Sequence, residues 1–302
     1  EKYVAKRVEF LQKNSLVKHR AKLLENLTPT ENIYVNFAHT ILQGALSLHQ
    51  NNHVEIANKQ VSIGLVRMAN INPIVAVAKE LTKLTLPENT HIHLCVYHSR
   101  YPLAVRSYLE SQLDRMLSRK KSWPPKDLQK KIVEIKAQNQ LFIVLASPVA
   151  EVGRDHDYDW AVIEPSSMRS IIQIAGRVLR HRDTTPEQEN ILLINQNIKQ
   201  LKGSERCFNR PGFELENLGL KMVQHQLSEV LIEQQYQQIN AIERVIKSNL
   251  DPKNNLVALE HQALLEQLFK NSKSAKLWWK EQVHWCGVLQ NMQPFRKSAK
   301  DE

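Results

Sequence analysis

Apolar and amphipathic segments alternate through the middle of the chain. The apolar segments have the length of buried strands, and they are 61–68 ("VSIGLVRM"), 91–97 ("HIHLCVY"), 141–147 ("LFIVLAS"), 160–165 ("WAVIEP") and 191–195 ("ILLIN"). Segments with the apolar spacing of a helix lie between them, at 74–84, 101–117, 126–139 and 168–180. Strands and helices that alternate over short connections predict an α/β fold, in which helices cover both faces of a parallel sheet. Ligands of such sheets bind beyond the carboxyl ends of the strands.

The segment before this alternation has a different pattern. Residues 2–27 have helical spacing that stops at "TPT", and a second helical stretch covers 33–49. The first clear strand pattern after them begins at residue 61. We therefore predict a helical linker over residues 1–58 and an α/β domain over residues 59–200.

Beyond residue 199 the pattern is helical again. Residues 217–252 predict one or two long helices that end at an Asp-Pro pair, and residues 256–270 predict another. An aromatic cluster, "LWWKEQVHWCG", follows. We therefore predict that residues 201–302 form a mostly α accessory region.

Composition narrows the class of protein. Lys and Arg total 41 against 31 Asp and Glu, a net charge of +10, and a basic balance favours a polyanionic partner. The three cysteines lie far apart, so neither a disulfide framework nor a zinc motif is predicted. With no run of about 18 apolar residues and no signal peptide, we expect a cytoplasmic protein that does not bind membranes. The chain begins with Glu1 rather than Met, which indicates a piece of a longer protein.

The loop after the strand at 141–147 carries candidate chemistry. "SPVAEVGRDHD" places a hydroxyl (Ser147), a glycine (Gly153) and a carboxylate (Asp155) just past the carboxyl end of that strand. These groups suit a phosphate oxygen, a close backbone approach and ribose hydroxyls. On the residues alone, a nucleotide-binding loop and a well-capped acidic loop both stay open.

The segment "QIAGRVLRHR" places Gln173, Arg177 and Arg180 at helical spacing around Gly176. Residues three and four apart share a helical face, so an amide and two guanidiniums would face the same way. Paired arginines suit the charge that develops on a phosphoryl group in transfer. The alternative is a basic helix end that complements the helix dipole.

Two other kinds of site are disfavoured. "DHDYD" offers oxygen and nitrogen donors, but consecutive residues rarely converge on one ion, so no metal site is predicted here. A phosphate cradle of the GxxxxGK[ST] type is absent from the sequence, and no DExD or DExH box occurs. The chain therefore supplies at most half of a nucleotide site, and alone we expect it to be inactive.

Several of these motifs resemble those of a known protein family. "SPVAEVGRDHD" and "SIIQIAGRVLRHR" resemble motifs V and VI of superfamily 2 helicases. "GLVRMANINP", "YHSRYPLAVRSYLE" and "CFNRPGFE" are similar to stretches of the helicase–nuclease of type I CRISPR systems, subtype I-F. Ile174 stands where many superfamily 2 members carry an arginine, which leaves two candidate finger arginines and their division of labour open.

The resemblance implies a fold and a set of site residues. Residues 59–200 would be the second RecA-like lobe of an ATP-driven DNA helicase. Its implied catalytic residues are Arg177, Arg180 and Gln173, and its implied ATP-binding residues are Gly153, Asp155 and Gly176. Its implied DNA-binding residues are Arg67, Tyr97, His98, Arg100 and Ser147.

The resemblance also implies cofactors and partners. ATP with Mg2+ would be bound mainly by the first RecA-like lobe, which this chain lacks, and a divalent metal would serve a nuclease domain that it also lacks. The implied partners are single-stranded DNA and the CRISPR RNA-guided surveillance complex, with the CRISPR integrase and phage-encoded inhibitor proteins as further candidates. The function implied is CRISPR interference against invading DNA.

Two alternatives stay open. Residues 115–131 are strongly basic and contain Trp123, so they form either a DNA-tracking strip or a solvated helix and loop. Trp278 and Trp285 are seven apart, which favours core packing over base stacking. For the whole chain, the alternative to a helicase lobe is a non-catalytic RecA-like module that docks a protein partner or an inhibitor.

Overall fold

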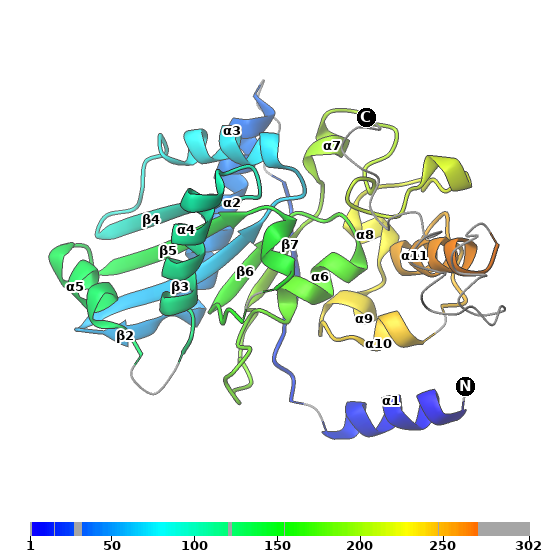
Figure 1. Cartoon of the computed structure of the whole chain (residues 1–302), viewed down its shortest axis with the longest axis horizontal. Helices are drawn as coiled ribbons and strands as arrows, with labels where there is room; N and C mark the ends of the chain where they lie inside the picture. Colours follow the sequence, from blue (N-terminus) through cyan, green and yellow to red (C-terminus); the bar gives the residue numbers. More distant parts are fainter. Residues whose placement is uncertain are drawn as a thin grey trace, which may run out of the picture.

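One sheet organises the larger part of the chain. The computed structural model describes residues 2–14, 16–26, 32–119, 123–153, 155–246 and 248–270. The strands are β1 (Ala21–Leu24), β2 (Val54–Ile56), β3 (Lys59–Arg67), β4 (Thr90–Tyr97), β5 (Asn139–Ala146), β6 (Trp160–Ile163) and β7 (Ile191–Ile194). Their order is β1-β7-β6-β3-β5-β4, all parallel, and β2 forms an antiparallel pair with the start of β3 (Figure 1).

The register aligns the carboxyl ends of the central strands. Arg67, the last residue of β3, stands opposite Ala146 of β5 and Ile163 of β6, and Ala146 stands opposite Tyr97 of β4. The loops that follow these strands therefore begin at one edge of the sheet. In an α/β fold this edge is the one that binds ligands.

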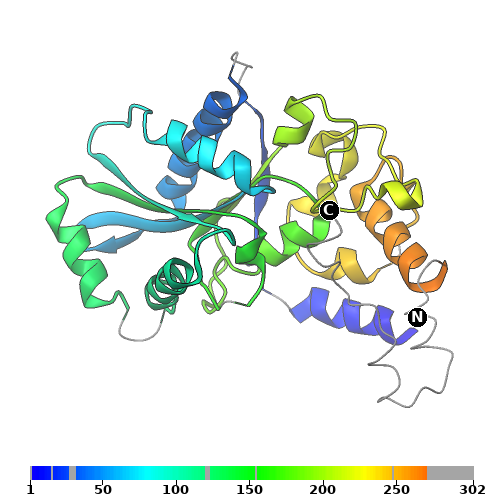
Figure 2. The ribbon, with the colours of Figure 1, turned by 45° about the horizontal axis from the view of Figure 1, so that its top comes forward.

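Helices cover both faces of the sheet. On one face lie α2 (Ile33–Asn52) and α3 (Ile71–Leu81), and on the other lie α4 (Leu103–Met116), α5 (Lys126–Glu134) and α6 (Met168–Ala175). Figure 2 shows α2 and α3 above the sheet and α4 and α5 below it. Strands β5, β6 and β7 are buried along nearly their whole length because they are covered twice, and this explains their unbroken apolar sequences. The predicted fold class, a parallel sheet with helices on both faces, is confirmed.

The segment before residue 59 differs from the expected helical linker. Helix α1 (Lys2–Asn14) ends early, and residues 21–24, which we predicted to be helical, form β1 beside β7. Helix α2 has the predicted position, but its buried face packs on the sheet together with β6 and β7. Residues 16–26 and 32–58 thus contribute to the layered domain, and only α1 stands apart from it (Figure 1).

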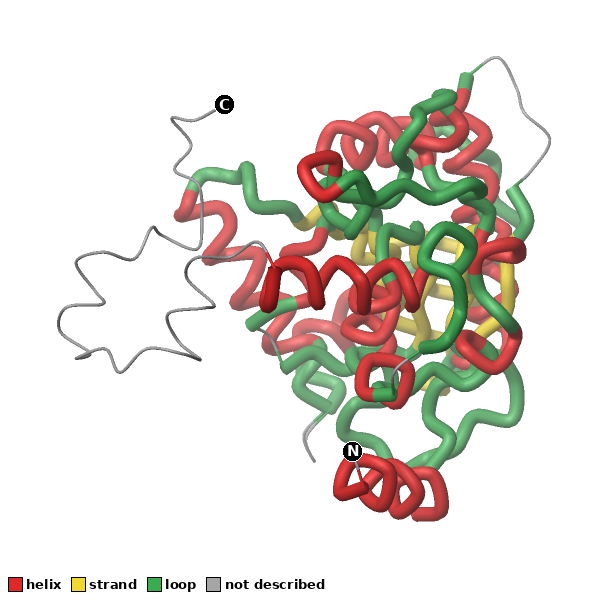
Figure 3. The backbone as a smooth tube through the Cα atoms, turned by 90° about the vertical axis from the view of Figure 1, so that its right-hand side faces the viewer, coloured by secondary structure: helices red, strands yellow, loops and turns green. Residues whose placement is uncertain are grey.

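The accessory region also differs from its pattern. In place of long helices over 217–252, the chain forms short turns of helix. These are η2 (Glu216–Leu218), α8 (Leu227–Val230), α9 (Glu233–Tyr236) and α10 (Ile242–Val245). Earlier comes α7 (Ile198–Leu201), and later come α11 (Leu256–Leu265) and the π-helical turn η3 (Glu266–Lys270), which match the helix predicted at 256–270. Figure 3 shows these helices in front of the sheet edge.

Two further expectations concern membrane association and the packing of the C-terminal tryptophans. No helix in the described part of the chain combines the length and the apolar character that crossing a membrane requires. The tryptophans predicted to pack in the core, 278 and 285, lie outside the described residues.

Candidate nucleotide and nucleic-acid site

The loop after β5 begins with a tight, capped turn. Ser147 caps the short 3-10 helix η1 (Pro148–Glu151), and its hydroxyl oxygen accepts a hydrogen bond from the amide of Val149 at 3.5 Å. Gly153 follows with a φ of +78°, a left-handed conformation that favours glycine. Asp155 comes next and is exposed. The sequence-predicted hydroxyl, glycine and carboxylate therefore all lie at the carboxyl edge of the sheet.

Helix α6 is shorter than predicted. It ends at Ala175 with Gly176 as its C-cap, so Gln173 lies on the helix while Arg177 and Arg180 lie beyond it. The chain turns away because Val178 forms a bridge with Tyr158, and Leu179 has a φ of +49°. The prediction that Gln173, Arg177 and Arg180 share one helical face is therefore wrong.

The turn nevertheless brings Arg180 to the predicted carboxylate. Nε of Arg180 lies 2.6 Å from Oδ1 of Asp155, and Nε2 of His181 lies 3.0 Å from Oδ2 of Asp155. The Arg180 and Asp155 side chains are 38% and 69% exposed, so both are open to a ligand. Burial of the Asp155 carboxyl acts to raise its pKa, but the charges and hydrogen bonds of His181 and Arg180 outweigh it and lower the pKa.

Arg177 has a different environment from Arg180. It is 8% exposed, and its Nη2 donates to the backbone carbonyl of Glu151 at 3.0 Å. Burial lowers the pKa of its guanidinium, and the charge of Arg180 acts in the same direction. Gln173 lies on the preceding turn, and its side-chain oxygen has no hydrogen-bond partner among the described residues. The structure thus gives one accessible arginine, one enclosed arginine and one unpaired amide oxygen.

The carboxylates of "DHDYD" hold arginines. Asp157 and Asp159 are fully buried; Arg182 bonds to both at 2.6 and 2.7 Å, and Arg119 bonds to Asp159 at 2.7 Å. No cluster suited to a metal ion occurs among the described residues. The guanidinium of Arg119 also stacks on Trp123, and its Cζ lies 3.8 Å from the ring centroid. Arg119 and Trp123, which both lie in the basic run at 115–131, therefore stabilise the fold. Residues 120–122 of that run are outside the described ranges.

A groove of about 920 Å³ runs along the same edge of the sheet. It is lined by the residues after β3 (69–73), after β4 (Ser99 and Arg100), after β5 (147–149) and by the start and end of α7 (Ile198, Lys199 and Lys202). In Figure 1 the flanking helices α3 and α7 lie near the top of the molecule. Arg100 and Lys202 are exposed and Lys199 is half-buried, so this groove is basic.

Four of the five predicted DNA contacts are buried, and for the three that do not line the groove this corrects the prediction. Arg67 is fully buried, and Glu151, Ser166 and the carbonyl of Glu164 take its hydrogen bonds. Tyr97 is 1% exposed and donates to Glu110, and His98 is 8% exposed and stacks on Tyr101. They end or follow strands as expected, but residues at strand ends point inward as often as outward. Ser147 lines the groove but is only 3% exposed, and Arg100 lines it as an exposed side chain.

Glu151 lies in the loop "SPVAEVGRD" that we predict to carry chemistry, but the sequence does not predict that its carboxylate is buried between β3 and α6. Sequence reasoning missed other residues of this site. Tyr34 and Lys202 line the groove from segments predicted to belong to the linker and to the accessory region, and Lys199 lines it from the end of the predicted α/β domain. The Tyr34 hydroxyl accepts from Lys202 Nζ at 2.7 Å. A polar pair at the start of α2 and the end of α7 carries no sequence signal because the two segments meet only in the fold.

The sequence of this chain is similar to parts of known proteins. The family model for the C-terminal part of the CRISPR-associated nuclease/helicase Cas3 matches residues 60–183. The chain is 41% identical to the CRISPR-associated nuclease/helicase Cas3 subtype I-F/YPEST of Pectobacterium atrosepticum, over 99% of this chain and 29% of that protein. It is 42% identical to the protein of the same name from Pseudomonas aeruginosa, over 84% of this chain and 24% of that protein.

A solved structure of T. fusca Cas3 with AMPPNP is similar to this chain at 15% sequence identity and a TM-score of 0.42. The similar region covers 60% of this chain and 18% of the T. fusca chain. The sequence relatives are close, although the chain spans less than a third of their length. The resemblance predicted from the motifs is confirmed, and the chain is homologous to the C-terminal part of the Cas3 helicase–nuclease of subtype I-F/YPEST.

Proposed function

We propose that this chain is the second RecA-like lobe and accessory region of an ATP-dependent single-stranded DNA translocase, joined in the complete protein to a nuclease and acting in CRISPR interference. One observation carries the proposal. Two loops that are separate in sequence bring the exposed Asp155 and the exposed Arg180 into contact at the ligand-binding edge of the sheet. The homology to the Cas3 helicase–nuclease supports the same function.

The residues present fit one side of a nucleotide. Arg180 is paired with the exposed carboxylate of Asp155 and also donates to the carbonyl of Gly176 at 3.5 Å. A triphosphate carries more negative charge than that carboxylate, so it would compete for the guanidinium. Asp155, once released, has two oxygens that can accept hydrogen bonds from ribose hydroxyls. Arg180 would then stabilise charge that develops on the transferred phosphoryl group. Bound ATP with Mg2+ supplies the phosphoryl group and its electrophilic centre, and a partner lobe would hold most of it.

The groove fits a single DNA strand. Arg100 and Lys202 place exposed positive charge on it, and Lys199 adds a partly enclosed ammonium. A strand's phosphates need such charge along the groove, and an aromatic ring such as that of Tyr34 offers a surface for a base. Ser147 joins the groove to the nucleotide loop because its hydroxyl caps η1. We propose that the surveillance complex delivers the strand to this groove.

The nucleotide half of the proposal is tested by Arg180→Ala in the complete protein that carries this region. We expect the DNA-stimulated ATPase turnover to fall by about 10³-fold or more, as for other arginine fingers. Arg7→Ala is the matched control, because Arg7 is an exposed arginine of α1 that lies outside the groove and outside the basic run at 115–131. ATP turnover unchanged in Arg180→Ala would refute the assignment and favour the non-catalytic module.

The DNA half is tested on the 302-residue chain itself. Binding of a fluorescent oligothymidine is measured by anisotropy over a range of salt concentrations. We expect Arg100→Ala and Lys202→Ala each to weaken binding and to reduce the slope of log affinity against log salt by about 1, because each removes one phosphate contact. Lys83→Ala is the control, since Lys83 is an exposed lysine that pairs with Glu80 and lies outside both the groove and the basic run at 115–131. Equal affinity and slope in all three variants would remove the groove from the DNA path.

A further inference from the structure

The turn that carries Arg180 depends on one peptide group in an unusual conformation. Leu179 has a φ of +49°, in the left-handed region that residues other than glycine rarely adopt. Arg180 is the next residue, and its Nε lies 2.6 Å from Oδ1 of Asp155. A rotation of the peptide between Val178 and Leu179 would change this φ and the direction in which the chain enters Arg180. A backbone conformation of this kind persists only where its surroundings hold it, so contacts that fix the peptide also fix the arginine.

Hydrogen bonds hold this peptide at both of its polar atoms. The amide of Leu179 donates to the carbonyl of Tyr158 at 3.0 Å, next to the bridge between Tyr158 and Val178. Nε2 of His19 lies 3.0 Å from the carbonyl oxygen of Val178. The N–H and C=O groups of a trans peptide point in opposite directions, so the two contacts hold it from opposite sides. The peptide therefore cannot rotate unless both contacts break.

His19 itself is held between the sheet and the accessory region. Its backbone carbonyl accepts from the amide of Ile239 at 3.1 Å, and the next residue, Arg20, forms a bridge with Gln238. Strand β1 begins directly afterwards at Ala21 and pairs with β7. The ring therefore belongs to a backbone segment that two other parts of the fold fix in place.

The ring of His19 faces two carbonyl groups, and a neutral imidazole has only one N–H group to donate. Nδ1 lies 3.3 Å from the carbonyl oxygen of Ile239, while Nε2 lies 3.0 Å from that of Val178. Burial lowers the pKa of His19, and the two carbonyls only partly oppose it, while the charge of Lys18 lowers the pKa further. The neutral form is therefore favoured, and the shorter contact indicates that its hydrogen is on Nε2 and is donated to Val178.

We infer that His19 is a positioning residue, which holds the peptide between Val178 and Leu179 and thereby keeps Arg180 beside Asp155. The inference rests on the proposed function, since it takes Arg180 to be the arginine that acts on the phosphoryl group. It assigns His19 no contact with the nucleotide. The segment that the sequence predicts to be a linker thus takes part in arranging the nucleotide site.

Two amide substitutions separate the two contacts of the ring. Glutamine places its amide nitrogen as far along the side chain as Nε2 of histidine, and asparagine places its own as far as Nδ1. His19→Gln therefore keeps a donor for Val178, whereas His19→Asn keeps one only for Ile239. Both variants lose the ring, so a comparison between them cancels the loss of its packing. His53→Gln is the matched control, because Nδ1 of His53 also contacts backbone carbonyls, at the end of α2.

The steady-state ATPase of the complete protein that carries this region, with saturating single-stranded DNA, gives kcat and the KM for ATP. In His19→Asn we expect kcat to fall by about 10²-fold, because a small misplacement of a catalytic group has an effect of this size. The KM for ATP should change much less, since Arg180 acts on charge that develops in the transition state. His19→Gln and His53→Gln should keep the kcat of the wild type.

Equal kcat values in His19→Asn and His19→Gln would overturn the inference, and so would a loss that appears only in the KM for ATP. A His19→Asn protein that does not fold would also overturn it, because His19 would then serve the fold rather than the turn. Unchanged turnover in Arg180→Ala refutes the proposed function itself. A loss in Arg180→Ala without a loss in His19→Asn refutes only the role of His19.

Discussion

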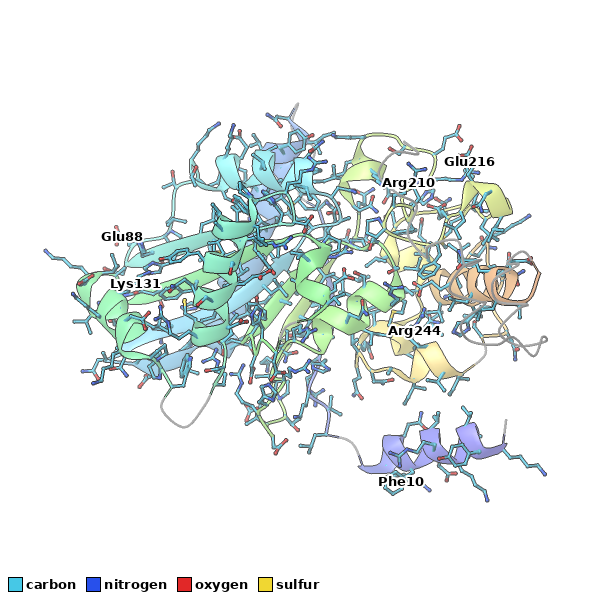
Figure 4. The ribbon with its side chains drawn as sticks, viewed as in Figure 1. Phe10, Glu88, Lys131, Arg210, Glu216 and Arg244 are labelled. Carbon is cyan, nitrogen blue, oxygen red and sulfur yellow. The ribbon has the colours of Figure 1, made fainter. Side chains whose placement is uncertain are left out.

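The accessory region holds the start of α6 through one buried carboxylate, Glu260, and its replacement by glutamine tests that contact. Glu260 on α11 is fully buried and accepts hydrogen bonds from the amides of Met168 and Arg169 at the start of α6. Arg244 of α10, which lies on the accessory side of α6 in Figure 4, pairs with the same carboxylate. An acidic side chain at this place also complements the dipole of α6.

Burial raises the pKa of Glu260 to about 7, and the attraction of Arg244 and the two backbone hydrogen bonds only partly oppose it. The folded chain therefore keeps a proton that the unfolded chain, with an ordinary pKa of 4.5, has already lost. The stability that this proton contributes is fully present below pH 4.5 and is lost as the pH rises through about 7. At about 1.4 kcal/mol per pH unit, the difference between 4.5 and about 7 amounts to about 3 kcal/mol.

Urea unfolding of the wild-type chain and Glu260→Gln between pH 4.5 and pH 8 measures this effect. Glutamine does not titrate, so its free energy of unfolding should depend less on pH than that of the wild type. The difference between the two should grow in favour of Glu260→Gln by about 3 kcal/mol from pH 4.5 to pH 8. Other titrating groups are the same in both chains and cancel. Parallel pH profiles would show that the carboxylate ionises freely in the folded chain and would refute the reasoning.

Two further changes test the packing that supports the site. Gly64→Ala on β3 should lower the free energy of unfolding by about 3 kcal/mol or more, because a Cβ there overlaps the ring of Trp160, and urea unfolding measures the loss. Asp159→Asn should lower it by about 3 kcal/mol, because Asp159 is buried and holds two arginines and the amide of Ile63. Asp183→Asn, whose side chain is 89% exposed, should change the same measurement by less than about 0.5 kcal/mol, and equal losses in the two aspartate variants would contradict the role of Asp159.

The strands that are buried on both faces of the sheet could be predicted from the sequence, because such burial requires a continuous run of apolar residues. Strands β5, β6 and β7 are apolar runs, and the helix over 33–49 has clear spacing, so each was found. Strand β1 was missed because "AKLL" suits a helix equally well and becomes a strand only by pairing with β7. The pairing of β1 with β7 depends on both segments, so the sequence of either segment alone does not predict it.

The prediction of long helices in the accessory region is wrong for a similar reason. Its pattern over 217–252 is helical, but distant polar groups bind its backbone and divide it into short turns. Asn195 at the end of β7 accepts from the amides of Leu227 and Ser228, and Asn255 donates to the carbonyl of Val230. These hydrogen bonds replace those of a continuous helix, and spacing along the chain cannot reveal them.

The two candidate arginines differ in how they are held, and this bears on the division of labour that the sequence left open. Arg180 is exposed, and its partner Asp155 is a side chain that can move away. Arg177 is enclosed, and its Nη2 donates to the backbone carbonyl of Glu151 in η1. A ligand that approaches from solvent can therefore attract Arg180 by charge alone, whereas Arg177 would have to leave its enclosed position to reach that ligand. We therefore expect Arg180, rather than Arg177, to be the arginine that can contact a nucleotide at this edge of the sheet.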